Sequence, residues 1–165
     1  MLKKSSTTKL IVFAIVCIII GMSINFVVHE LSHMLMLIIC QGSVEEISFG
    51  ANMFVGGYID HNYISVVALA SIFIPFIISF VLSLLKNTYV QFFNMGFSVP
   101  IVINILFGFV AHFFIKDIAT QNTYDLALAC NFMEENIIIL LLCGVILIIQ
   151  FWLIIEGFKK IYKKL

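Results

Sequence analysis

Hydrophobic residues follow one another in four long runs along the chain, separated by shorter segments rich in polar residues, glycine and asparagine. The runs cover residues of about 10–40, 64–85, 99–118 and 137–155. A helix needs about 20 apolar residues to cross a hydrocarbon core of about 30 Å, so each run is long enough for one membrane span. The first run is longer than the core, and a helix of that length has to tilt or project from the membrane.

The first connection, residues 41–63, contains two strand-like pieces, Val44–Phe49 and Met53–Ile59, set around glycines. Short runs of this kind, bounded by glycine and asparagine, are typical of strands joined by a turn. We therefore expect a hairpin or a re-entrant loop after the first helix, rather than a further span.

The later connections complete the predicted fold. Residues 86–97 are rich in aromatic side chains, so we expect this connection to lie at the membrane interface. Ser98 and Pro100 are typical of a helix start and predict the beginning of the third span. Residues 120–136 predict a short amphipathic helix along the membrane surface. The sequence thus indicates an all-α membrane protein, a single domain of residues 1–165 built as a bundle of four transmembrane helices with a short hairpin or re-entrant loop after the first.

The composition fits lipid as the main solvent of this chain. Hydrophobic residues make up 62% of it and charged residues 11%, whereas soluble domains contain about 45–50% apolar and about 25% charged residues. The formal net charge is zero and all nine basic residues are lysine. The chain therefore has no excess of positive charge and no arginine to bind phosphate, so the sequence does not indicate a nucleic-acid partner. The predicted partner is the lipid bilayer.

The lysines are distributed unevenly about the four spans. Eight of the nine precede the first span or follow the second and the fourth, and only Lys116 lies near the end of the third. Because lysine-rich flanks stay on the cytoplasmic side, this pattern predicts a multi-pass protein of the cell membrane with both termini in the cytoplasm.

A motif with metal-binding spacing, His29-Glu30-Leu31-Ser32-His33, lies in the first span. Histidines at positions i and i+4 project from one face of a helix and can bind one ion, and zinc accepts imidazole nitrogen readily. Glu30 follows the first histidine, where it can act as general base on a water that the metal activates. A charge within a span costs about 2.5–3.5 kcal/mol, so three ionisable groups in one helix need a common reason. A shared Zn²⁺ supplies it.

A catalytic zinc usually has three protein ligands and one open position, so a third ligand must come from elsewhere in the chain. Counted along the helices, the histidines lie near the outer end of the first span, and Asp117 lies at the outer end of the third. Asp117 is therefore the predicted third ligand. His112, one to two turns deeper, and Asp125, which can fold back toward the bundle, are the alternatives.

Four segments of the chain together resemble a known family. They are VVHELSHMLML, EEISFG, IFIPFIISF and HFFIKDIAT, in this order. The first resembles the active-site helix of site-2-protease-like membrane metallopeptidases, and the whole arrangement is closer still to a small bacterial family of zincin peptidases. The resemblance implies zinc binding by His29 and His33, Glu30 as the base, and an aspartate ligand from a later span, whose position Asp117 matches best.

These features favour a zinc-dependent, membrane-embedded peptidase that hydrolyses peptide bonds of a protein or peptide at or within the bilayer. The glycine-rich first connection predicts a surface to which an extended substrate adds as a strand. A non-catalytic regulatory or immunity-type membrane protein with a structural or vestigial metal site is the alternative, and replacing Glu30 separates the two. A small transporter is a third reading, disfavoured because the second and fourth spans show almost no polar groups.

Overall fold

The computed structural model of the protein describes residues 2–48, 54–115, 117–121, 123–132 and 136–162. Its long helices are α1 (Leu2–Ile39), α2 (Ile64–Leu84), α3 (Thr88–Phe114) and α6 (Asn136–Tyr162). The shorter elements are β1 (Ser43–Ser48), β2 (Phe54–Tyr58), the 3-10 helix η1 (His61–Tyr63), α4 (Ile118–Gln121) and α5 (Asp125–Asn131). Four helices are long and apolar enough to cross a membrane, so the predicted multi-pass, nearly all-α fold is confirmed.

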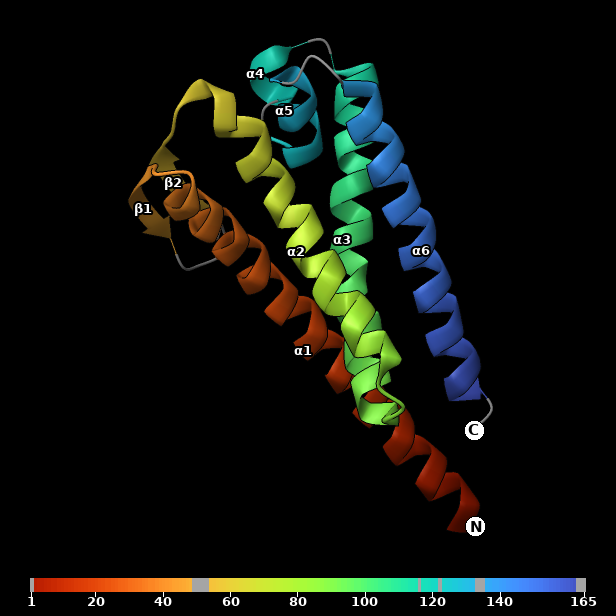
Figure 1. Cartoon of the computed structure of the whole chain (residues 1–165). Coiled ribbons are helices and arrows are strands. Elements are labelled where there is room, and N and C mark those ends of the chain that lie inside the picture. The colour runs from red at the N-terminus through yellow and green to blue at the C-terminus, as the bar shows by residue number, and fades with distance from the viewer. Residues whose placement is uncertain (1, 49–53, 116, 122, 133–135, 163–165) are drawn as a thin grey trace.

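The long helices form a bundle to which α1 runs obliquely (Figure 1). α1 packs on α2 and α3, whereas α6 packs mainly on α3. At about 1.5 Å per residue the 38 residues of α1 extend over roughly 57 Å, so the helix projects beyond the others at its N-terminal end. Both termini lie toward the same end of the bundle, and the β-hairpin lies toward the other.

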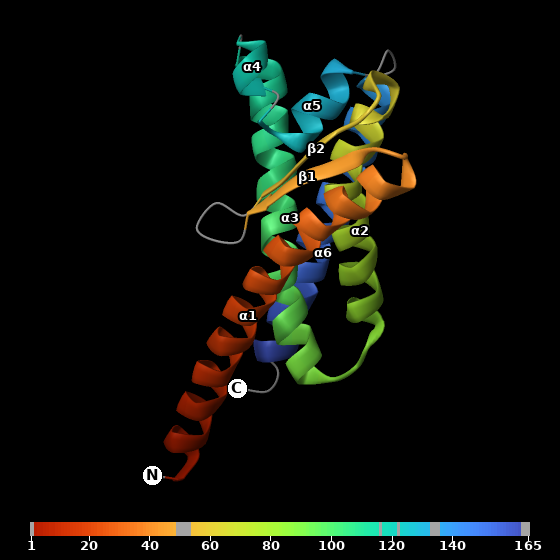
Figure 2. The same ribbon diagram turned by 90° about the vertical axis from the view of Figure 1, so that its left-hand side faces the viewer.

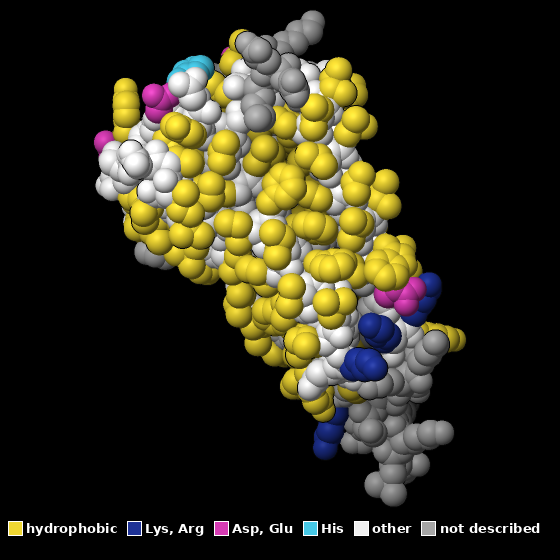
Figure 3. Space-filling model, in the orientation of Figure 1, with side chains coloured by type: hydrophobic (Ala, Val, Ile, Leu, Met, Phe, Trp, Pro, Cys, Tyr) yellow, Lys and Arg dark blue, Asp and Glu magenta, His cyan; other side chains and the backbone are white. Residues whose placement is uncertain are grey.

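The outward faces of the helices are apolar. Large hydrophobic side chains are exposed along α1 and α6, among them Ile15, Ile19, Leu141, Ile148 and Trp152. In Figure 3 hydrophobic side chains cover most of the face shown, and lysine side chains gather at the end where the termini lie. An apolar band with polar groups at its two ends is what contact with a bilayer requires.

The interior of the bundle is organised around α3, which contacts all the other long helices and α5. One buried hydrophobic cluster joins α2, α3, α5 and α6, and it includes Ile72, Phe97, Ile105, Leu126 and Cys143. This cluster holds the later helices together, so the placement of α1 on α3 decides where the motif histidines lie.

Two glycines allow α1 and α3 to cross with their backbones in contact. A Cβ atom added at Gly96 would lie 2.0 Å from the carbonyl oxygen of Ile18, and one added at Gly21 would lie 2.2 Å from that of Phe93. Small residues at such crossings let membrane helices approach closely. One turn further along α1, the Asn25 Nδ2 donates to the Phe97 carbonyl over 2.8 Å, which fixes the register of the two helices.

Two residues after the end of α1, Gln41 adopts the left-handed backbone conformation, with a φ of 62°. The Gln41 amide donates to the Ile38 carbonyl over 3.1 Å, and the Gly42 amide donates to the Leu37 carbonyl over 2.8 Å. This pair of bonds is the Schellman arrangement that satisfies the last carbonyls of a helix and turns the chain. The turn leads directly into β1.

The first connection forms an antiparallel hairpin of β1 and β2, with an irregularity between Val44 and Glu46. This confirms the predicted hairpin, although Phe49 and Met53, which the prediction included in the strands, lie outside the described residues. A Cβ atom at Gly57 would lie 2.2 Å from the Ser43 carbonyl oxygen, so the strand pairing requires glycine there. Figure 2 views the hairpin from its own side of the bundle, where it packs on α1.

The predicted start of the third span is wrong. α3 begins at Thr88, after an Asn87 side chain that accepts a hydrogen bond from the Tyr89 amide over 2.9 Å, and it continues through Pro100 as far as Phe114. Proline inside a membrane helix is tolerated because neighbouring helices can satisfy the carbonyl it frees. Residues 88–97, predicted as a connection, are therefore helical.

The predicted amphipathic surface helix is also corrected. Among the described residues in the middle of that segment, the seven of α5 form the helix, and their Leu126, Ala127, Ala129 and Cys130 side chains are buried. The Ser65 hydroxyl donates to the Ala129 carbonyl over 3.0 Å, tying α5 to α2. Because α5 is inserted among the long helices instead of lying on the surface, it carries its first residue, Asp125, into the bundle.

Candidate metal centre

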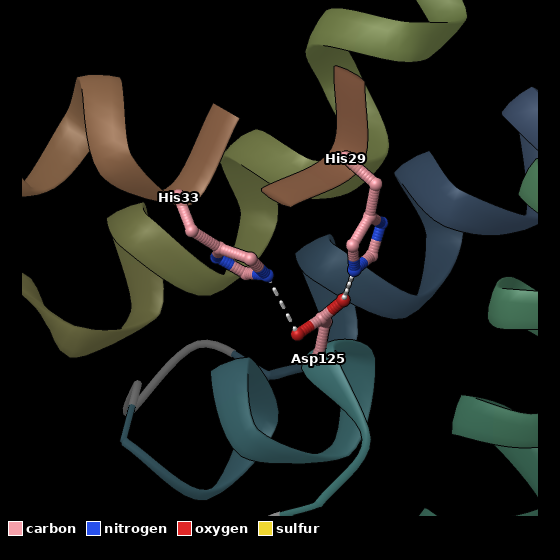
Figure 4. A group of neighbouring side chains, drawn as sticks. All are labelled: His29, His33 and Asp125. Carbon is pink, nitrogen blue, oxygen red and sulfur yellow. Dashed lines mark ion pairs between the residues drawn. The ribbon is translucent and has the colours of Figure 1, made fainter. Parts of the chain in front are cut away.

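Three metal-binding side chains meet where α1 passes α5. His29 and His33 come from α1, one helical turn apart, and Asp125 is the first residue of α5. One ligand atom from each can be chosen so that all lie within 4.8 Å of one another. Figure 4 shows the two imidazoles and the carboxylate pointing toward one another from their two helices.

Both histidines direct Nε2 at the same carboxylate. The His29 Nε2 lies 3.1 Å from Asp125 Oδ2, and the His33 Nε2 lies 3.2 Å from Asp125 Oδ1. The two rings are nearly perpendicular, with centroids 5.0 Å apart. Two imidazole nitrogens and one carboxylate oxygen are a ligand set that catalytic zinc uses, with a further position open. The residues present therefore fit Zn²⁺.

The His33 ring is held in place from behind. Its Nδ1 lies 3.0 Å from the Val67 carbonyl oxygen of α2. In the tautomer that donates this hydrogen bond, Nε2 keeps its lone pair and presents it to the centre. A backbone carbonyl or carboxylate on the far nitrogen is the usual way in which proteins orient a metal-binding histidine.

The carboxylate of Asp125 also has partners outside the group of three. Its Oδ2 accepts a hydrogen bond from the Ser71 hydroxyl of α2 over 2.7 Å and one from the Asn104 Nδ2 of α3 over 3.0 Å. Burial by itself raises the pKa of this carboxyl, but the hydrogen bonds and charges of His29 and His33 outweigh it and hold the pKa well below its usual range. These neighbours thus favour the ionised form of Asp125, the form in which a carboxyl group binds a metal.

Glu30 lies beside the group without belonging to it. Its Oε1 is 3.8 Å from the His29 Nε2, and its side chain is 17% exposed. Both Glu30 and the three clustered residues line one cavity of about 1500 Å³. The base predicted from the sequence therefore lines the same cavity as the three candidate ligands.

The cavity is walled by most of the elements at the hairpin end. α1, α2 and α3 contribute to its lining, and so do β2 and the segments before α2 and α5. The lining residues outside the long helices include Gly57, Tyr58, Ile59, Asp60, His61, Thr123 and Tyr124. Mainly apolar walls with a few polar groups are the usual lining of a ligand-binding site.

The structure does not bring Asp117, the predicted third ligand, to the histidines. It lies exposed in the connection between α3 and α4, where its carbonyl accepts from the Gln121 amide over 2.9 Å. The prediction compared the depths of the histidines and Asp117 as if their helices were straight and upright. Because α1 is tilted and the chain reverses after α4, it is the alternative residue, Asp125, that lies level with the histidines. His112 is outside the group, and its buried Nδ1 has no hydrogen-bond partner among the described residues.

Sequence reasoning missed the residues that hold the ligands. The second span was expected to offer almost no polar groups, yet its Ser65, Ser71 and Ser79 are all buried and hydrogen-bonded. Serines in an otherwise apolar span were the available signal, since a hydroxyl buried in a membrane helix needs a partner. Asn104 is a polar residue of the third span, but its partner is 21 positions away and no local pattern identifies it.

Comparison with protein-family models, with curated proteins and with solved structures finds no match for this chain. The resemblance to membrane metallopeptidases thus stays a prediction from short motifs. The class of protein has to be argued from the site itself.

Proposed function

We propose that this protein is a zinc-dependent peptidase of the membrane, which hydrolyses peptide bonds of a protein or peptide at or within the bilayer. The observation that carries the proposal is the convergence of His29, His33 and Asp125 on one point of a cavity whose wall also carries Glu30. The likeness of residues 27–37 to a metallopeptidase active-site helix favours the same reaction over other hydrolyses.

In this proposal His29, His33 and Asp125 hold the ion, and a bound Zn²⁺ supplies Lewis acidity and lowers the pKa of water toward neutrality. Glu30 accepts a proton from the attacking water as the new C–O bond forms. It then returns a proton to the amide nitrogen as the C–N bond breaks, so that no external acid or base is consumed. The apolar walls of the cavity limit the access of bulk water, which strengthens these charge interactions.

The hairpin is the proposed docking surface for the substrate backbone. β2 pairs with β1 alone within the described residues, and its Gly57 and Tyr58 line the cavity. A substrate segment that adds to β2 as a strand is extended, so its amide bonds are accessible, unlike those of a helix. Deleting residues 43–58 should then abolish cleavage while zinc binding is kept; unchanged cleavage would exclude this mode.

The orientation in the cell membrane follows from the lysines and is likewise a proposal. Lysine side chains gather at the end of the bundle where both termini lie, opposite the hairpin. Termini in the cytoplasm therefore imply a cavity that opens toward the outer face. Labelling of single cysteines introduced near Tyr58 and near Lys86 in intact cells tests this, because only the first should react with an impermeant reagent.

The test of the proposed reaction is the Glu30→Gln variant. It keeps the size of the side chain and leaves the three ligands in place, but it cannot accept a proton. Membranes of cells producing the original protein should contain new protein N-termini that are absent from membranes of cells producing Glu30→Gln. Both purified proteins should contain equal amounts of zinc.

Two outcomes would overturn the peptidase proposal. One is a set of N-termini that is the same with the original protein, with Glu30→Gln and without either. The other is a phenotype that Glu30→Gln supports fully, which would favour the non-catalytic regulatory or immunity-type protein with a structural metal site.

A further inference from the structure

We propose that Asn104 and Ser71 are positioning residues of the metal centre: they hold one oxygen of Asp125 and so leave the other oxygen free to bind the ion. This inference rests on the proposed zinc site and names two residues that the motif does not contain. It assigns a task to the centres of α2 and α3, which supply no ligand themselves.

The two oxygens of the Asp125 carboxylate differ in their number of close polar neighbours. Oδ2 has three neighbours, the Ser71 Oγ at 2.7 Å, the Asn104 Nδ2 at 3.0 Å and the His29 Nε2 at 3.1 Å. Among the described residues, Oδ1 has one such neighbour, the His33 Nε2 at 3.2 Å. When the two Nε2 atoms present lone pairs to an ion, they no longer donate to the carboxylate. Oδ2 then keeps two donors and Oδ1 keeps none from this set.

Each oxygen of the carboxylate can accept only a limited number of hydrogen bonds. A carboxylate oxygen offers about two lone-pair directions, so the hydroxyl of Ser71 and the amide of Asn104 occupy Oδ2. The Ser71 hydroxyl also lies 2.7 Å from the Ala68 carbonyl oxygen, but it has a single proton, and an ionised carboxylate is the stronger acceptor. Asp125 is therefore prepared to bind through Oδ1 alone.

The two donors lie on two different long helices. Ser71 lies near the middle of α2 and is 2% exposed, and Asn104 lies on α3 four residues after Pro100. Asp125 begins a helix of only seven residues, which has little rigidity of its own. Donors on two long helices that face one carboxylate oxygen compensate for this, because they fix the side chain of Asp125 from both sides.

Ser65 provides a matched control. It lies on the same helix as Ser71, is equally buried, and also donates to α5, but to the Ala129 carbonyl and not to Asp125. Ser65→Ala therefore removes a hydrogen bond that holds α5 without removing a donor from the carboxylate. Asn104→Leu complements Asn104→Ala, because a side chain of the same branched shape removes the amide without leaving an empty space.

The experiment is zinc competition against a chelator of known affinity, on the full chain in detergent micelles. Ser71→Ala, Asn104→Ala and Asn104→Leu should each bind zinc about 10–100-fold more weakly than the original, the usual effect of removing a group that orients a metal ligand. The visible absorption of Co²⁺-loaded protein should shift in the same three variants, and Ser65→Ala should match the original in both measurements. Unfolding of zinc-free samples confirms that each variant is folded.

Three results would overturn the inference. Equal weakening by Ser65→Ala would mean that the hydrogen bonds merely attach α5. Affinities and cobalt spectra that are unchanged in the Ser71 and Asn104 variants would mean that Asp125 needs no such support, while the zinc site itself would stand. Failure of the original protein to bind zinc at all would remove both this inference and the proposed function.

Discussion

Two clusters of polar side chains in the described part of the bundle differ in what surrounds them. The metal-centre cluster (His29, His33, Asp125, Ser71 and Asn104) borders the large cavity at the hairpin end. The sealed cluster lies nearer the lysine-bearing end, where the Ser79 and Ser98 hydroxyls are 2.8 Å apart and the Ser79 hydroxyl donates to Gln150 Oε1 over 3.2 Å. Its three residues are 0–1% exposed and do not line the cavity.

The two clusters show two different uses of polar groups in a membrane bundle. The sealed cluster contains only neutral groups, and its Gln150 Nε2 has no partner among the described residues. The metal-centre cluster contains ionisable groups, each held by further contacts. Charged groups within a membrane bundle are far more costly than amides or hydroxyls and by default mark a functional-site hypothesis, whereas neutral polar groups between helices commonly serve packing.

The largest difference between the clusters should appear when zinc is added. A ligand present at 100 times its dissociation constant stabilises the folded state by about 2.7 kcal/mol. We expect a zinc-dependent rise in the free energy of unfolding of this order for the original protein, measured in detergent micelles with and without chelator. His33→Ala should abolish the rise, because it removes a ligand.

Gln150→Leu provides the matched comparison from the sealed cluster. It should retain the full response to zinc, since Gln150 is remote from the cavity. The same zinc response in His33→Ala as in the original would show that the stabilising ion binds somewhere else.

A smaller effect is expected at the α1–α3 crossing. Gly96→Ala forces a Cβ atom to within 2.0 Å of the Ile18 carbonyl oxygen, so the helices must separate. Overpacking of this kind costs about 1–3 kcal/mol, and zinc affinity should fall as well, because α1 carries both histidines. Unfolding and zinc competition measure the two effects.

Gly144→Ala is the control for the crossing. It lies on α6, and an added Cβ atom there has no neighbour within 4 Å in the described structure. Alanine in a helix interior is favoured over glycine by about 0.5–1 kcal/mol, so this variant should be neutral or more stable. Equal losses in both glycine variants would contradict close backbone contact at the crossing.

The smallest effect is expected for Gln150→Leu in the sealed cluster. Gln150→Leu removes an amide whose Nε2 is unpartnered among the described residues and leaves the Ser79–Ser98 bond in place, so the free energy of unfolding should change by less than about 1 kcal/mol. Ser79→Ala leaves the Gln150 Oε1 buried without its donor and should cost about 1–3 kcal/mol. A larger loss of stability in Gln150→Leu than in Ser79→Ala would mean that the Gln150 Nε2 donates a hydrogen bond after all.

The sequence predicts much of this arrangement because the relevant signals are local. The four apolar runs, the glycine-bounded strands and the i, i+4 histidines each depend on neighbouring residues, and they correspond to the helices, the hairpin and the paired imidazoles. The start of α3 was missed because Pro100 was treated as a helix start, although Asn87 before Thr88 is an equally good capping signal.

The choice between Asp117 and Asp125 depends on a chain reversal, which no local pattern records. Asp117 is nearer the end of the apolar run, so a depth argument favours it. Asp125 precedes a short run of small and apolar residues, 126–130, that fits among α2, α3 and α6 once those helices are in place. Its partners Ser71 and Asn104 are separated from it by 54 and 21 positions, so only the tertiary fold brings them together.

The most direct test of the account is the zinc content of three purified proteins: the original, Asp125→Ala and Asp117→Ala. The account predicts one zinc ion per chain in the original and in Asp117→Ala, and loss of that ion in Asp125→Ala. Loss in Asp117→Ala together with a full complement in Asp125→Ala would contradict it.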